Sequence, residues 1–147
     1  AKMGYETVAL ATVRQNTFST IWNLVDVNKP SGWTVVASFP EDEASFPCIV
    51  INDAKVKPRI VTLETSGVIL EDIKIEIEFY ALARSGMDKI NEGRDNVQNT
   101  FLSNTATLDT YNLYLLENPF DDSEISPFIS GKQKINQAAC IIGLGMK

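Results

Sequence analysis

Histidine is absent from this chain of 147 residues, and cysteine occurs only twice, at Cys48 and Cys140. Without histidine the most common general base is missing, which excludes a Ser–His or Cys–His nucleophile pair. Two cysteines without histidine do not make a standard zinc site either. Both cysteines have apolar neighbours in the sequence. This predicts buried free thiols rather than a disulfide, and we expect no metal and no cofactor.

Long apolar runs and positive charge are also scarce. No stretch of about 20 consecutive apolar residues occurs, so we expect no membrane span and no membrane partner. The chain has 13 Lys and Arg residues against 19 Asp and Glu residues, a net charge of −6. This balance argues against tight nucleic-acid binding driven by phosphate neutralisation. An acidic surface can still let nucleic acid slide past without sticking, although acidity of this size also serves solubility.

The hydrophobic pattern is informative. The stretch 73–79 alternates strictly between apolar and charged residues, which predicts a half-buried strand in an antiparallel sheet. It continues directly into a helix-like pattern, in which Ser85 and Asp88 have the spacing of a capping box. Helices are predicted at 7–28 and 85–103. Strands are predicted at 33–39, 48–51, 59–64, 68–83, 113–116 and 134–146, with a turn at 65–67 and a long loop at 117–131.

These elements predict an α+β fold. It consists of one mainly antiparallel sheet with two main helices packed on one face, in a single domain over 1–147. The predicted core places four strand residues against four helix residues: Ile73, Ile75, Ile77 and Phe79 against Phe18, Ile21, Val97 and Phe101. Met87 and Ile90 are expected on the same buried side of the second helix. Gly93 weakens that helix by about 1 kcal/mol relative to alanine, so either another group packs closely there or the helix is locally soft.

No set of residues forms a recognisable catalytic cluster, and we predict no enzymatic activity. Acidic residues in the two predicted loops could bind a hard cation, but they lack the spacing of a calcium loop. Glu76 and Glu78 could mimic a glycosidase pair, yet they are also the ordinary outer face of a half-buried strand. Lys55, Lys57 and Arg59 are expected near these two carboxylates across the sheet. The candidates for an interface or a channel wall are Glu41, Asp42, Glu43, Lys74, Glu76, Glu78, Asp121, Asp122 and Glu124.

The order of the elements resembles that of the tail-terminator (tail-completion) proteins of long-tailed bacteriophages. After an N-terminal helix, the resemblance rests on four segments: "FPCIVI" at 46–51, "IKIEIEFYALA" at 73–83, "SGMDKINEGRDNVQNTF" at 85–101 and "INQAACIIGLGM" at 135–146. It covers nearly the whole chain, as a pattern of period and order.

The resemblance implies a structural virion protein that is assembled in the host cytoplasm. Six copies would form a ring that caps the tail tube protein, meets a head-side connector or neck protein, and lets DNA pass through its centre. The charged face of strand 73–79 would then meet a neighbouring subunit or the channel. Two alternatives stay open. One is another neck component, such as a head-closure or adaptor ring or a sheath-associated protein. The other is a small ligand-binding domain or enzyme.

Overall fold

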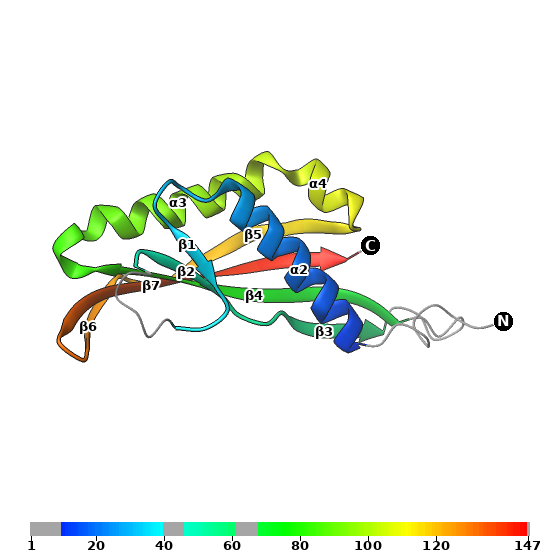
Figure 1. The fold of residues 1–147 in the computed structure, drawn as a ribbon. Helices are drawn as coiled ribbons and strands as arrows, with labels where there is room; N and C mark the ends of the chain where they lie inside the picture. The colour runs from blue at the N-terminus through cyan, green and yellow to red at the C-terminus, as the bar shows by residue number, and fades with distance from the viewer. Residues whose placement is uncertain (1–9, 40–45, 61–67, 147) are drawn as a thin grey trace.

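The computed structural model describes residues 10–39, 46–60 and 68–146 (Figure 1). Its helices are α2 (Leu10–Asn28), α3 (Met87–Ser103) and α4 (Thr105–Thr110), with a 3-10 turn, η2, at Ala83–Ser85. Its strands are β1 (Thr34–Val36), β2 (Cys48–Ile51), β3 (Lys55–Ile60), β4 (Val68–Leu82), β5 (Leu113–Asp122), β6 (Ser126–Ser130) and β7 (Gln133–Met146).

The strands form one seven-stranded sheet in the order β1-β2-β4-β7-β5, with β3 also paired to β4 and β6 also paired to β7. Among the strands that the structure describes, β1 and β2 form the one parallel pair, and the other pairs are antiparallel. Figure 1 shows the helices gathered on one side of this sheet. The α+β fold with a mainly antiparallel sheet is therefore confirmed.

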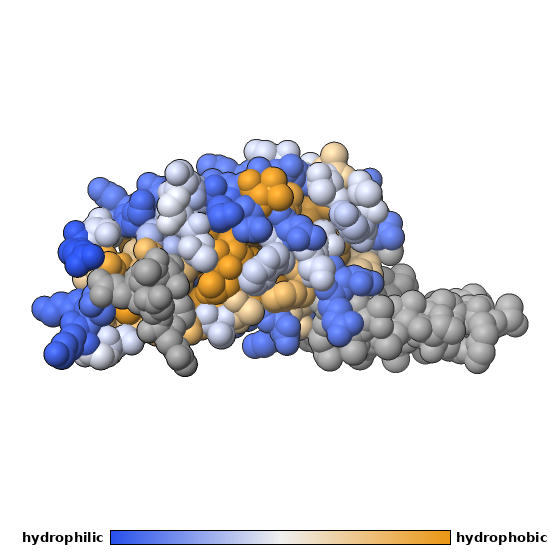
Figure 2. All heavy atoms as spheres, in the orientation of Figure 1, coloured by the Kyte–Doolittle hydropathy of each residue, from blue (hydrophilic) through white to orange (hydrophobic). Residues whose placement is uncertain are grey.

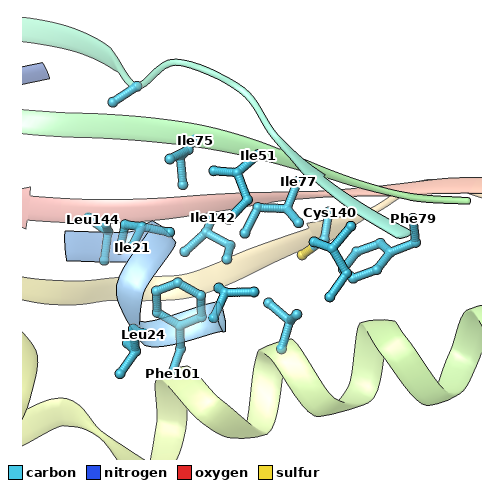
Figure 3. Packing of buried hydrophobic residues seen from close by; sticks show 14 of the residues in the cluster. Ile21, Leu24, Ile51, Ile75, Ile77, Phe79, Phe101, Cys140, Ile142 and Leu144 are labelled. Atoms are coloured by element: carbon cyan, nitrogen blue, oxygen red, sulfur yellow. The ribbon is translucent and has the colours of Figure 1, made fainter. Parts of the chain in front are cut away.

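The long strand β4 is the centre of the fold, and its alternation divides the sheet into two faces. Ile73, Ile75, Ile77 and Phe79 are fully buried and belong to the main core cluster. Figure 3 shows Ile75, Ile77 and Phe79 pointing into the space between sheet and helices. On the adjacent strand β7, Ala138 lies opposite Phe79. A small residue beside a large one leaves room for the ring in a closely packed core.

The helices contribute the other half of this core, as predicted. Ile21 on α2 and Val97 and Phe101 on α3 are fully buried, and Phe18 packs against the cluster while partly exposed. These residues recur every three or four positions, so each helix presents one apolar stripe to the sheet. Figure 3 shows Ile21 and Phe101 pointing toward the strands.

Gly93 is the point at which α3 packs closely against Trp33. A Cβ atom added there would lie 2.5 Å from Cη2 of Trp33, whereas carbon atoms in contact normally stay about 3.5–4.0 Å apart. The indole N–H of Trp33 donates a hydrogen bond to Oε1 of Glu92, at 2.8 Å. Close packing, the first of the two predicted explanations for Gly93, is therefore the one that the structure supports.

The predicted loop at 117–131 is wrong. Strand β5 continues to Asp122, and β6 forms a further strand. The β5–β7 register shifts between Leu115 and Phe120, and Asn118 in this interval has a positive φ of 53°. Such an irregularity breaks the two-residue period by which a strand is recognised in sequence.

Other boundaries also differ from the prediction. The strand expected at 33–39 is limited to β1, β3 begins earlier than expected, and α4 was not predicted. The expected turn at 65–67 lies outside the described residues. Lys55 is paired with Lys74, so Glu76 is its diagonal neighbour on the same face of the sheet. The expected capping box is also wrong, because Gly86 is the N-cap of α3 and no side chain caps this end. Met87 is exposed rather than buried.

Candidate interaction surfaces

The sheet face opposite the helices is the first candidate, and we call it the open face. It follows from the alternation of β4 and from the register with β7. Within the described ranges no helix covers it, since the buried residues of α2, α3 and α4 all join the core on the other face. Its central side chains are Lys74, Glu76, Glu78 and Tyr80 on β4 and Gln137, Ala139 and Ile141 on β7.

One end of the open face is closed by a second, smaller apolar cluster. Tyr80 is its centre, only 7% exposed, beside the buried Cys48 and Ile135. The rings of Phe39 and Phe128 contact Tyr80 edge-on, with centroids at 4.9 and 6.0 Å. Edge-to-face packing of this kind stabilises aromatic groups beyond their burial alone. This end of the open face is therefore occupied by the chain itself.

Glu78 is fixed by hydrogen bonds at the border of that cluster. Its carboxylate accepts from the Tyr80 hydroxyl at 3.1 Å, from Nε2 of Gln137 at 3.3 Å and from Nδ2 of Asn52 at 3.3 Å. Burial and the neighbouring Glu78 charge raise the pKa of Tyr80 above its ordinary value. Glu78 is thus a structural acceptor, while Glu76 beside it has no side-chain hydrogen bond among those that the structure describes.

The other end of the open face is cationic. Lys74 and Lys55 are both exposed and lie directly opposite each other on β4 and β3. Like charges in opposite positions of a ladder repel each other weakly. The open face therefore runs from a lysine pair, through the carboxylate of Glu76, to the aromatic cluster. This order of charges suits a partner surface with the complementary order.

The predicted acidic group of Asp121, Asp122 and Glu124 does not form one patch. Asp121 is opposite Ile141 of β7 and therefore belongs to the open face, whereas Asp122 is opposite Cys140, on the helix side. Nε2 of Gln98 donates to Oδ1 of Asp122 at 2.7 Å. All three acids are exposed, but Asp122 ties β5 to α3. Glu41, Asp42 and Glu43 lie outside the described residues.

Arg94, which interrupts the apolar side of α3, makes a second hydrogen-bonded contact between α3 and the end of β5. Its guanidinium donates to the carbonyl oxygen of Ser123 at 2.7 Å. The Arg94 and Gln98 contacts could not be predicted from local sequence, because their acceptors lie 29 and 24 residues further along the chain. Polar residues at positions 94 and 98, one turn apart on an otherwise apolar side, were the only available signal.

Both cysteines are buried and free, as predicted. Burial is the main reason that the pKa of each thiol is raised to about 12, and the negative charge of Glu78 adds to it at Cys48. Thiols of this kind are mainly protonated at neutral pH and are poor nucleophiles.

The second candidate surface is a groove of about 920 Å³ between α2 and the corner formed by α4 and the start of β5. None of the described residues that line it is charged, although 22% of the whole chain is. Leu24, Leu113 and Met146 supply apolar contacts. Amide and hydroxyl groups line it from both sides, notably at Asn16, Thr20, Asn23, Asn104, Thr107 and Asn112.

Sequence reasoning missed this groove, which we call the α2–α4 groove. Its α2 wall follows helical spacing at Asn16, Thr20, Asn23 and Val27, an uncharged stripe beside the buried one. Val27 is 81% exposed and Tyr111 is 54% exposed. Figure 2 shows that hydrophilic residues cover most of the described surface in this view, with apolar residues in small separate patches.

No group of three or more His, Cys, Asp or Glu residues within the described ranges is placed to hold a metal ion. In the same part of the chain, no helix is long and apolar enough to cross a membrane. Comparison with models of protein families gives no match, and comparison with curated proteins gives none either.

Proposed function

We propose that this chain is a structural protein of a long-tailed bacteriophage, a tail terminator whose six copies form a ring on the tail tube. The observation that carries this proposal is the open face. A seven-stranded sheet with its helices on one side leaves a broad second surface, ordered from cationic to acidic to aromatic. Such a surface suits a partner of fixed orientation, as in a symmetric assembly. The proposed role is not enzymatic.

The order of elements supports the same proposal. The segments on which the resemblance rests form β2, the β4–α3 unit and β7. In a ring, β4 would carry the core on one face and meet a neighbouring subunit, the tube or the channel with the other. This is a physical use for a long strand with one charged face and one apolar face.

The acidic balance of the chain suits DNA passage through such a ring. Carboxylates on a channel wall repel phosphates, whereas a ring of lysines or arginines would release counterions and hold the duplex. Two sets of variants separate a channel wall from an interface. In the first, Glu41, Asp42 and Glu43 are replaced by lysine. In the second, Asp121 and Glu124 are replaced by lysine. Asp122 is kept, because its carboxylate accepts a hydrogen bond from Gln98.

The outcomes of these variants differ. A cluster on the channel wall should slow DNA ejection from intact particles, and a cluster at an interface should prevent heads from joining tails. Normal assembly and normal ejection in both sets would contradict a role for either cluster.

The function itself is tested by deleting the gene from the phage to which the proposal assigns it. The expected result is separate heads and tails, and joining should be restored when the purified chain is added to the extract. Negative-stain images of the restored particles should show a ring at the head-proximal end of the tail tube. Normal particles without the chain would contradict the proposal, and a ring found on the head alone would indicate a head-closure protein.

A further inference from the structure

Two edge strands of the sheet carry opposite charge. Strand β3 contains three cations and no acidic residue: Lys55, Lys57 and Arg59. Strand β5 contains three acids and no cation: Glu117, Asp121 and Asp122. We call β3 the basic edge and β5 the acidic edge.

The two edges lie on opposite sides of the sheet. Lys74 of β4 is paired with Lys55 of β3 on one side and with Gly143 of β7 on the other, and β5 pairs with the far side of β7. Figure 1 accordingly shows β3 and β5 on the two sides of the β4–β7 pair. Three strand spacings, about 14 Å, separate them. Neither ion pair in the described part of the chain joins the two edges.

Acidic residues also occur near the basic edge, but they lie further in or precede it. Asp72 is opposite Lys57, and Glu76 is the diagonal neighbour of Lys55. Both acids belong to β4, one strand closer to the centre of the sheet. The exposed Asp53 precedes β3. A copy that approaches this side of the sheet therefore meets the cations of β3 before the carboxylates of β4.

Arg94 is a cation near the acidic edge. Its guanidinium donates to the carbonyl oxygen of Ser123, beside Asp122. Arg94 belongs to α3 on the helix side of the sheet, whereas Asp121 belongs to the open face. Glu117 and Asp121 are both exposed. The acidic edge therefore presents carboxylates that Arg94 does not cover.

We infer that the acidic edge of one copy docks against the basic edge of the next copy, so that the subunits of the ring stand side by side. This inference rests on the proposed ring and names the contact between its subunits. Unlike edges attract each other, whereas a contact between two like edges brings charges of one sign together. Because the two edges differ and lie on opposite sides of the chain, the contact is heterologous, and it closes into a ring when the rotation between copies permits.

Side chains make this contact, rather than a sheet that continues from copy to copy. Each edge strand contains a proline, Pro58 in β3 and Pro119 in β5, and proline has no N–H group to donate to a ladder. The register of each strand with its own neighbour also shifts there. With its edges against neighbouring subunits, each copy keeps the open face for the tail tube or the channel.

Two charge-reversed variants of the full chain test the contact. The acidic-edge variant carries Glu117→Lys and Asp121→Lys, and keeps Asp122 because it accepts a hydrogen bond from Gln98. Its self-association is measured by sedimentation over a wide range of concentration. Its ability to join heads to tails is measured in the extract that lacks the chain.

The basic-edge variant carries Lys55→Glu and Arg59→Glu and is measured in the same two assays. Lys57 is kept, because a carboxylate there would be opposite Asp72 of the same copy. Circular dichroism establishes that both variants are folded.

Matched controls make the same changes of net charge away from the edges. Asp88→Lys with Asp95→Lys reverses two exposed acids of α3, and Lys132→Glu with Lys134→Glu reverses two exposed cations at the start of β7 and the turn before it. Both controls should behave like the unmodified chain.

Each edge variant alone should lose self-association at least about tenfold and fail to join heads to tails, since its two edges then have the same sign. An equal mixture of the two variants should recover both activities, because every contact between unlike variants again unites opposite charges. Unchanged self-association and joining in either edge variant would overturn the contact. Losses that the mixture does not recover, or that the controls share, would overturn it as well.

Failure of the contact and failure of the tail-terminator role are distinguishable. If the unmodified chain restores joining and both edge variants do so too, the edge contact is wrong and the ring stands. If the variants and their mixture behave as expected in sedimentation but the unmodified chain does not restore joining, the contact stands and the tail-terminator role is wrong. If the unmodified chain neither self-associates nor restores joining, both proposals are wrong.

Discussion

Replacing Gly93 by alanine tests the packing of α3 against the rest of the molecule. In an exposed helix interior this change stabilises by about 1 kcal/mol. Here the new methyl group would lie 2.5, 2.7 and 2.9 Å from three ring atoms of Trp33. The ring has little room to move, because it is 3% exposed and contacts Phe79 edge-on.

The magnitude follows from two opposing effects. Overpacking a well-filled core costs about 1–3 kcal/mol, and a 2.5 Å contact belongs at the upper end of that range. After subtracting the helix propensity gained by alanine, we expect Gly93→Ala to lower the free energy of unfolding by about 1–2 kcal/mol. For a chain of this length, each kcal/mol lowers Tm by about 2–4 °C.

Urea denaturation monitored by circular dichroism measures the effect. Asn99→Ala, on the exposed side of the same helix, is the control and should be neutral or stabilising by a few tenths of a kcal/mol. In a Trp33→Phe background the smaller ring leaves space, so Gly93→Ala should lose most of its cost, and the double-mutant cycle gives the coupling. Stabilisation by about 1 kcal/mol in the unmodified background would refute the close contact.

Four further changes probe stability. Phe79→Ala removes a fully buried ring and should cost about 3–5 kcal/mol in the same denaturation assay, so a loss below about 1 kcal/mol would contradict the core. Thr17 is 1% exposed and its hydroxyl oxygen has no hydrogen-bond partner, so Thr17→Val should leave stability unchanged or raise it. Thr100→Val, which removes a 2.8 Å hydrogen bond, should instead cost about 0.5–1.5 kcal/mol, and equal effects at the two threonines would contradict the assignment. The hydrogen bond from Trp33 is the main reason that the pKa of Glu92 lies below its ordinary value of 4.5. Its stabilisation is complete above that value and is lost as pH falls through the lower pKa of the folded state, so Glu92→Gln should make unfolding less dependent on pH in acid, and an unchanged pH profile would contradict this.

Much of the fold could be predicted because its main elements have a regular period. The alternation of Ile73 to Phe79 and the stripes on α2 and α3 each result from one-sided burial, which sequence reports directly. The β5–β6 region could not be predicted, since the irregularity around Asn118 breaks the period and exposed Ser, Pro and Asp residues suggest a loop. The short helix α4 carries a single buried residue, Leu108, and one position defines no period.

The candidate surfaces were only partly predictable. The charged face of β4 was evident from Lys74 and Glu76, because alternation alone determines which side chains share a face. That Asp121 and Asp122 point to opposite faces of the sheet was not evident, because this follows only if both residues belong to strand β5. The α2–α4 groove arises from elements about 80 residues apart in sequence, and its uncharged polar lining resembles an ordinary solvated surface until the two walls are brought together.

The central claim is a ring of six copies in the virion, and the most direct measurement is the cross-linked mass of the chain within intact phage particles. Particles are treated with a lysine-reactive cross-linker, and the products containing the chain are identified by mass spectrometry. Lys55 and Lys74 are exposed and available to the reagent. The account predicts a series of products that ends at six copies of the 16.3 kDa chain, about 98 kDa. Particles that lack the chain, or that release it only as a monomer, would contradict the account.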